Sequence, residues 1–458
     1  MKRILITFSL IISLLLVTSC SNYFSKKELH QSNVTPDLHL SANTGNAKFK
    51  ARWWEDYGSP ELNKLVEEAL AQNLTLKIAQ ARVKEARAKM ASYNANRFPQ
   101  VDLGYDYEKE KNADGSISDD SNYFFTPTYT VDLWGANYAL YKSYENKFIA
   151  QEFQAKAAAM TIISEVVSTW LKIRFGQKEY DLLNEQLHSY EGVLKYQLNN
   201  YTQGTAADQD ILNNQNKIQQ FTTRIYQNII KVDGLRYELA YLIGRSPAQD
   251  IKISNKDLPP LIPLPAKGLS SDLIKDRPDI KSAWYTLIAA DWDEHNSKLA
   301  MLPTFDISVK FSDVNLGSVL GSWSKIANTV TYTAMDWGRL RSGVAEKKAI
   351  VERNVATYVD TVYRAIVEVR NELIKNKHQL EQISWFENQL KLAQAKYNEA
   401  KVNAENGGGD SISVIFKLIN LRNDELALVR ENEKLNLRRV NLYNSLGGNV
   451  WKSNSKAS

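Results

Sequence analysis

The sequence predicts a mainly α-helical protein with a smaller β part, built as two structural repeats. The first observation is a pair of very long proline-free stretches, residues 135–244 and 338–446, whose apolar side chains recur in steps of three and four. The second is a set of shorter segments in which apolar and polar residues alternate. The third is a nearly constant offset of about 203 residues between matching landmarks of the two halves, which indicates an internal duplication.

The chain opens with a processing signal. A basic pair precedes the apolar run 4–17, which ends in Val-Thr-Ser-Cys at residues 17–20. This ending resembles a bacterial lipobox, whose cysteine becomes the first mature residue and carries lipid such as palmitate. Cys20 is the only cysteine, and lipidation explains its solitude better than an ordinary cleaved signal with an incidental cysteine. We expect a signal peptide over 1–19 and a lipid anchor at Cys20.

Repeat 1 is expected over residues 59–254, after a lipidated extended linker at 20–58. Ser59 as N-cap and Pro60 in the first turn begin a helix whose apolar pattern continues to about Asn96. No segment after the leader has the roughly 20 apolar residues that a membrane helix requires. We therefore expect any membrane-spanning part to be β.

After Pro99 the period of the pattern changes from 3.6 to 2. Strands are expected at 99–110 and 123–134, on either side of a polar loop, and again at 304–313 and 326–336. Strands of about ten residues, apolar on one face and polar on the other, are typical of a transmembrane barrel with a wet lumen. An ordinary half-buried hairpin in a soluble sheet gives the same pattern. Pro127 argues against a full-length second strand.

The number of strands per chain is compatible with a membrane barrel only if several chains combine. Four strands cannot close a barrel, and a membrane does not accept open sheet edges. Four strands from each of three chains would make a barrel of about twelve strands. The pattern therefore predicts a homotrimer.

The two proline-free stretches are expected to be long antiparallel helical hairpins at 135–244 and 338–446. Their breaks fall at Gly204 and at 407–409, where the glycines are Gly407, Gly408 and Gly409. Acidic residues follow both breaks, and either complement the positive ends of the returning helices or contribute to a gate. Both roles can hold at once, and the acids are Asp208, Asp210 and Asp410.

A proline-rich crossover is expected over 255–275, between repeat 1 and repeat 2 at 276–450, with a C-terminal tail at 451–458. Repeat 2 opens with the motif Arg277-Pro278-Asp279. Pro278 suits a first helical turn and Asp279 suits a positive helix end. We interpret Arg277 as a structural salt-bridge residue rather than a ligand-binding one.

Composition and motifs argue against several functions. The formal charge of +5 comes without a basic stripe, so we expect no nucleic-acid partner. The five histidines have no metal-ligand spacing, and no nucleotide-binding or nucleophile motif occurs. We expect no catalytic residues, no metal and no cofactor, and hence no enzyme.

Several of these landmarks together resemble the TolC/OprM family of outer-membrane efflux proteins. The matching pieces are Arg97-Phe98-Pro99, Asp132-Leu133-Trp134-Gly135, Gly204 with Asp210-Ile211-Leu212, Arg277-Pro278-Asp279-Ile280 and the terminal Leu446-Gly447-Gly448. The resemblance implies a trimeric, twelve-stranded outer-membrane β-barrel, with four strands per protomer, continued by a long periplasmic α-helical barrel. Departures are Trp284-Tyr285 after the Arg277 motif and the glycine-rich second break.

The resemblance also implies a function. Proteins of this kind are the passive exit ducts of tripartite efflux systems, with a periplasmic adaptor and an inner-membrane transporter of the RND type as partners. It places the protein in the outer membrane, anchored through Cys20, with a large periplasmic part. It makes the residues at both hairpin ends candidates for the gate.

Two alternatives remain open at the sequence level. One is an outer-membrane exporter of a type I protein secretion system, against which the lipobox argues. The other is a lipid-anchored periplasmic coiled-coil adaptor without a pore, against which the duplication argues. The sequence does not distinguish drugs, metals, solvents and peptides as substrates.

Overall fold

The computed structural model describes residues 26, 29–34, 52–203, 207–249, 251–254, 257–264, 276–312 and 323–447. These divide into two compact units that each contain parts of both halves of the sequence. The first unit takes residues 1–37, 80–154 and 279–361, and the second takes 38–79, 155–278 and 362–458. Cys20, the signal peptide, Gly204 and the tail at 451–458 lie outside the described residues.

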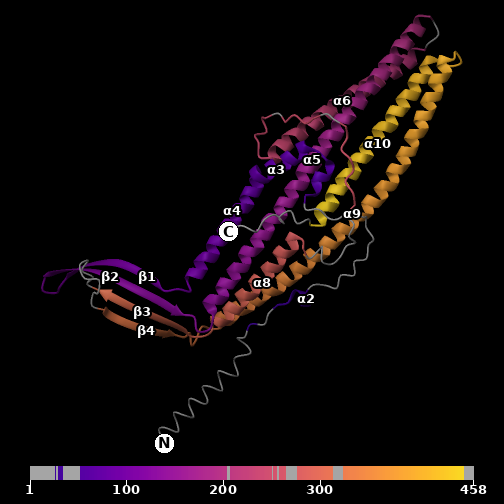
Figure 1. The fold of residues 1–458 in the computed structure, drawn as a ribbon. Helices are drawn as coiled ribbons and strands as arrows, with labels where there is room; N and C mark the ends of the chain where they lie inside the picture. Colours follow the sequence, from indigo (N-terminus) through magenta and orange to yellow (C-terminus); the bar gives the residue numbers. More distant parts are fainter. Residues whose placement is uncertain are drawn as a thin grey trace. The chain divides into compact units, whose positions relative to one another are not determined.

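The first unit contains a four-stranded antiparallel sheet in the order β1-β2-β3-β4 (Figure 1). The strands are β1 (Gln100–Lys111), β2 (Ile117–Val131), β3 (Thr304–Ser312) and β4 (Trp323–Thr331). Each has at least the nine residues that a tilted membrane-spanning strand needs, by the usual minimum of about nine. The β1–β2 hairpin extends into the predicted polar loop, because Asp114 and Gly115, with a φ of 84°, make a tight turn there.

Pro127 does not end its strand, contrary to the sequence expectation. It lies inside β2 and is paired in register with Val101 of β1. The described pairs between β2 and β3 include Phe125 with Phe311 and Thr128 with Ser308, but none at positions 126 and 127. A proline is tolerated in this strand because its missing N–H falls in that gap in the ladder.

Short helices flank the long ones. They are α2 (Gln31–Val34), the 3-10 helix η1 (Trp53–Tyr57), α3 (Pro60–Gln72), α4 (Leu74–Ala95) and α8 (Pro278–Leu299). The helix expected from Ser59 to about Asn96 is broken at Asn73, whose side chain is buried. The side-chain Oδ1 of Asn73 accepts from the Leu76 N–H at 2.9 Å, and the side-chain Nδ2 donates to the Leu242 carbonyl at 2.7 Å. The asparagine thus caps α4 and ties it to α6.

Two pairs of long helices repeat almost identically along the chain. The pairs are α5 (Ala136–Thr202) with α6 (Asp208–Leu242), and α9 (Arg339–Glu405) with α10 (Ser411–Ser445). The first helix of each pair has 67 residues and the second has 35. From Ala136 to Arg339 and from Asp208 to Ser411 the step is 203 residues in both cases.

The core of the second unit is built on aromatic residues that the sequence places just before α3. Trp53 stacks on Tyr443 of α10 with ring centroids 5.3 Å apart, and Trp54 is 1% exposed. Around them pack apolar residues of α3, α5, α6 and the segment 251–262. This core fixes the base of the two hairpins in the second unit. Among the described residues, no helix is long and apolar enough to cross a membrane.

Candidate functional site

The end of the second hairpin is closed by glycines. α9 ends at Glu405, and Gly407 has a φ of 77°, in the left-handed region that side chains disfavour. The Gly408 N–H donates to the Asn403 carbonyl at 3.0 Å, which pairs an otherwise free carbonyl at the helix end. A Cβ on Gly409 would lie 3.0 Å from the Ala404 nitrogen. The glycine run therefore permits a turn tighter than other residues would allow.

Asp410 joins the two hairpins at this end. Its carboxylate caps α10 by accepting from the Ile412 N–H at 3.3 Å. The same carboxylate accepts from the hydroxyl of Tyr196, on α5 of the other hairpin, at 3.2 Å. Sequence reasoning identified Asp410 but missed Tyr196, because nothing in the spacing around Tyr196 indicates a partner more than 200 residues away.

The contact between Tyr196 and Asp410 is one of a row of polar contacts between the antiparallel helices α5 and α10. Arg422 approaches Glu185 to 2.8 Å. Gln186 Nε2 donates to Asn423 Oδ1 at 2.7 Å, and Arg430 Nε donates to Glu179 Oε1 at 3.0 Å. We call this row the α5–α10 seam. Beside these polar contacts, Leu182 and Leu183 of α5 pack in one buried apolar cluster with Leu426 of α10, so the seam combines polar pairs with an apolar contact.

The end of the first hairpin carries the other two candidate acids. Asp208 and Asp210 lie exposed in the first turn of α6, where they complement the positive end of the helix dipole. Asp208 bonds the Tyr201 hydroxyl and thereby raises the pKa of Tyr201. Gly204 itself lies outside the described residues. No hydrogen bond between these acids and Asp410 is found in the described part of the chain.

Arg277 is buried in the second unit, directly before the first residue of α8. Its guanidinium donates to the Ser445 carbonyl at 2.7 Å and pairs with Glu368 of α9 at 3.0 Å. Gly447, with a φ of 75°, approaches so closely that a Cβ there would lie 2.4 Å from Arg277 Cγ. Pro278 begins α8, and Asp279 follows in its first turn. These contacts support a structural interpretation of the motif, since Arg277 ties the end of α10 to α9.

The sheet of the first unit has two unlike faces. On one face lie the side chains of Val101, Leu103, Tyr105 and Tyr123. Residues of β3 lie on the same face, because Leu103 is paired with Phe125 and Phe125 is paired with Phe311. Leu103 is 80% exposed, so nothing in the described part of the chain covers this apolar face. The opposite face carries polar side chains, for example Thr130, whose hydroxyl bonds Asp306 at 2.6 Å.

Aromatic side chains gather where the strands meet the long helices. Trp337 is 93% exposed and is the one non-glycine residue with a positive φ, 55°, in the described part of the chain. Trp134 precedes the corresponding helix, and its indole donates to the Pro303 carbonyl at 2.8 Å. Asp132 and Asp336 each accept backbone N–H groups from the first turn beyond these tryptophans. Exposed tryptophans beside apolar strands are typical of a membrane–water interface.

Among the residues that the structure describes, no group of three or more His, Cys, Asp and Glu could hold a metal ion. The histidines lie apart: His188 and His378 contact only glutamates on their own helices in the contacts found here.

Comparison with known proteins agrees with these features. The family described as outer membrane efflux protein matches residues 65–232 and 269–448. The chain is 23% identical over 461 residues to the pyoverdine export outer membrane protein OpmQ of Pseudomonas aeruginosa, with 97% of both chains covered. It is 26% identical over 415 residues to the solvent efflux pump outer membrane protein SrpC of Pseudomonas putida, with 86% of both covered.

Solved structures share the fold. The outer-membrane channel OprN has a TM-score of 0.80 at 22% identity, covering 93% of this chain and 99% of that one. The open state of the MtrE outer membrane channel of Neisseria gonorrhoeae has a TM-score of 0.79 at 19% identity, covering 93% and 98%. The family match spans most of the chain, and its fold is that of outer-membrane channels. The chain therefore belongs to the outer membrane efflux protein family, and it is an outer-membrane efflux channel.

Proposed function

We propose that the protein is the passive exit duct of a tripartite efflux system, formed by three copies of the chain. The observation that carries this proposal is the sheet of the first unit. It has four antiparallel strands, two open edges at β1 and β4, an uncovered apolar face and a polar face. A membrane accepts such a sheet only when the edges are paired, and three copies pair them in a ring of about twelve strands.

In this assembly the apolar face contacts lipid and the polar face lines the lumen. The aromatic residues around Trp134 and Trp337 would then lie at the periplasmic boundary of the membrane. Lipidation at Cys20 would add an anchor in the same leaflet. The anchor remains a proposal from the lipobox, because Cys20 lies outside the described residues.

The hairpin ends are proposed as the gate and as the docking site of a periplasmic adaptor. The residues are Asp208 and Asp210 on the first hairpin, and Gly407, Gly408, Gly409 and Asp410 on the second, together with Gly204. The contact between Tyr196 and Asp410 holds the two hairpins of one copy together at this end. An adaptor that binds the separated arrangement better would open the duct by shifting this two-state equilibrium.

The partners and cargo follow by analogy with relatives. An inner-membrane transporter, of the RND type, would supply the energy. The names of two relatives mention pyoverdine and solvents. We propose small organic molecules as the cargo, without choosing among them. The internal duplication, with repeats over 59–254 and 276–450, is proposed as the origin of the two matching hairpins.

Conductance across a planar lipid bilayer tests the duct. The detergent-purified full chain should give small, infrequent openings, and these should become larger or more frequent in an Asp208→Asn/Asp210→Asn/Asp410→Asn variant. Lys109→Gln, which changes one charge at the far end of the β1–β2 hairpin, serves as a charge control. A preparation that stays silent in every variant contradicts the proposal that acidic residues at the hairpin ends gate the duct.

A further inference from the structure

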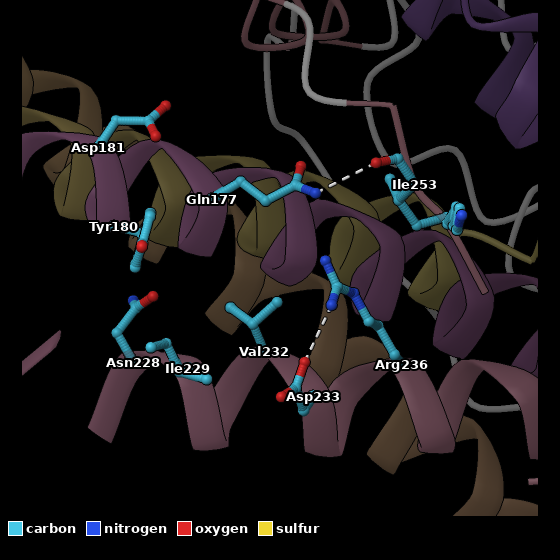
Figure 2. Close-up of a pocket in the computed structure, with 10 residues that line it drawn as sticks. Gln177, Tyr180, Asp181, Asn228, Ile229, Val232, Asp233, Arg236 and Ile253 are labelled. Carbon is cyan, nitrogen blue, oxygen red and sulfur yellow. Dashed lines mark hydrogen bonds and ion pairs between the residues drawn. The ribbon is translucent and has the colours of Figure 1, made fainter. Parts of the chain in front are cut away.

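A cavity of about 550 Å³ lies in the second unit (Figure 2). Its walls come from α5, α6 and the segment 251–254. The volume falls within the roughly 300–1,000 Å³ of small-molecule sites. Apolar lining comes from Tyr180, Ile229, Val232 and Ile253. The proposed duct uses none of these residues.

The main polar group of this cavity is the side chain of Asn228. It is 5% exposed, and neither its amide nitrogen nor its carbonyl oxygen has a hydrogen-bond partner among the described residues. Figure 2 shows the amide pointing from α6 toward α5, beside Tyr180. A buried amide without partners is costly, and a ligand that bonds both of its polar atoms would remove that cost.

Two further polar atoms at the same cavity lack partners in the described part of the chain. Gln177 donates through Nε2 to the Ile253 carbonyl at 3.2 Å, which leaves its Oε1 unpaired. Arg236 uses Nη1 to reach Asp233 at 2.9 Å, which leaves its Nε–H unpaired. The cavity therefore offers two acceptors, on Asn228 and Gln177, and two donors, on Asn228 and Arg236.

The charges around the cavity balance. Asp181 and Asp233 are acidic, and Arg236 and Lys252 are basic, so the formal charges sum to zero. A ligand with net charge would bring a charge that none of these groups is free to balance. A neutral ligand would not.

We propose that this cavity binds a neutral organic molecule that carries a carboxamide or peptide group. A carboxamide presents a donor and an acceptor side by side in one plane, which is the complement of the Asn228 side chain. The remainder of the ligand packs against Tyr180, Ile229 and Val232. The site is a lateral pocket of the channel wall, and its occupancy is independent of whether the duct conducts.

Binding of benzamide to the detergent-purified full chain tests the site, measured by ligand-observed NMR titration. Benzamide has the carboxamide and an aromatic body, whereas acetophenone has the same shape and carbonyl but no N–H donor. Benzamide should bind at least about tenfold more tightly than acetophenone, a difference of about 1.4 kcal/mol. Equal affinities, or no binding of benzamide to the wild-type protein, would overturn the proposal.

Two substitutions on α6 form a matched pair. Asn228→Leu removes the unpaired amide, and Asn214→Leu removes an equally buried asparagine whose Nδ2 donates to the Tyr190 carbonyl at 3.0 Å. Asn228→Leu should weaken benzamide binding at least about tenfold and raise the melting temperature. Asn214→Leu should lower the melting temperature and leave benzamide binding unchanged.

If Asn228→Leu lowers the melting temperature as much as Asn214→Leu does, Asn228 already has a hydrogen-bond partner. That result would overturn the proposal. A second variant, Ile229→Trp, keeps Asn228 but fills the cavity. This variant should not bind benzamide. If it binds benzamide as the wild-type protein does, benzamide binds outside this cavity and the proposal is wrong.

Discussion

Glu431 and Glu433 lie two positions apart on α10, and their carboxylates have opposite surroundings. Burial raises the pKa of Glu433, and Lys231, at 4.0 Å, compensates only in part. Burial would also raise the pKa of Glu431, but hydrogen bonds from Lys434 and Gln379 outweigh it and lower that pKa. Two neighbouring acids therefore change the stability of one helix in opposite directions as the pH changes.

The signs follow from linkage. A raised folded pKa means that the contribution of Glu433 is favourable below its unfolded pKa, about 4.5, and is lost as the pH rises through the folded value. Glu433→Gln should therefore raise the melting temperature at neutral pH and remove this loss. Glu431→Gln should lower the melting temperature at neutral pH. The ionised Glu431 stabilises the fold above its unfolded pKa, and this stabilisation is lost as the pH falls. Thermal melts of both variants across pH 4 to 8 check this, and shifts of equal sign would contradict it.

Tyr196 is the residue at which stability and gating should separate. Its hydroxyl bond to Asp410 is exposed, so Tyr196→Phe should change the unfolding free energy by less than about 1 kcal/mol. If the same bond holds the closed arrangement, its loss should raise the open population up to about fivefold. Single-channel recordings measure the open probability, with Tyr180→Phe on the same helix as control. An unchanged open probability would remove Tyr196 from the gate.

At the scale of elements, the sheet depends on one close approach between strands. Gly104 of β1 is paired with Phe124 of β2, whose ring lies over it: a Cβ on Gly104 would be 2.1 Å from the ring. Lys310 of β3 lies 4.4 Å from the centre of the same ring. The glycine, the ring and the lysine thus link three strands on the polar face of the sheet.

Gly104→Ala should force the Phe124 ring aside and destabilise the sheet by about 1–3 kcal/mol. The yield of heat-resistant oligomer on an unheated gel should fall. Adding Phe124→Ala removes the ring and should restore part of that yield. If the double variant is worse than Gly104→Ala alone, the close approach is not the cause.

The α5–α10 seam gives a prediction about motion. Replacing Glu185 and Arg422 by cysteine puts two thiols across the seam, where the native side chains are 2.8 Å apart and partly exposed. If opening needs α5 and α10 to move relative to each other, a short bifunctional maleimide that joins them should abolish large openings in bilayer recordings. Each single cysteine variant, treated in the same way, should conduct normally. Normal conduction in the joined double variant would show that opening does not use this seam.

The sequence predicts elements well where the pattern is local. The long helices follow from proline-free 3/4 spacing, and the strand faces follow from alternation in residues such as Leu103 and Tyr105. The break at Asn73 was missed, because its cause is a bond to the Leu242 carbonyl far along the chain. The partner of Asp410 and the cavity at Asn228 were missed for the same reason: both depend on which helices pack together.

At the scale of the whole molecule, the chain is incomplete without further copies. The sheet leaves two edges open, and Leu103 and its neighbours expose an apolar face. α6 also exposes a stripe of large side chains at helical spacing: Tyr226, Ile230, Tyr237 and Tyr241. Exposed stripes of this kind mark protein–protein contacts, and we propose that another copy covers this one.

The most direct test of the central claim is the number of chains in the conducting particle. Native mass spectrometry of the detergent-solubilised protein, on the fraction that conducts in bilayers, should give three chains per particle. That result would pair the edges of β1 and β4 between copies and close about twelve strands into one ring. A conducting monomer or dimer, or a trimer that never conducts, would contradict the account.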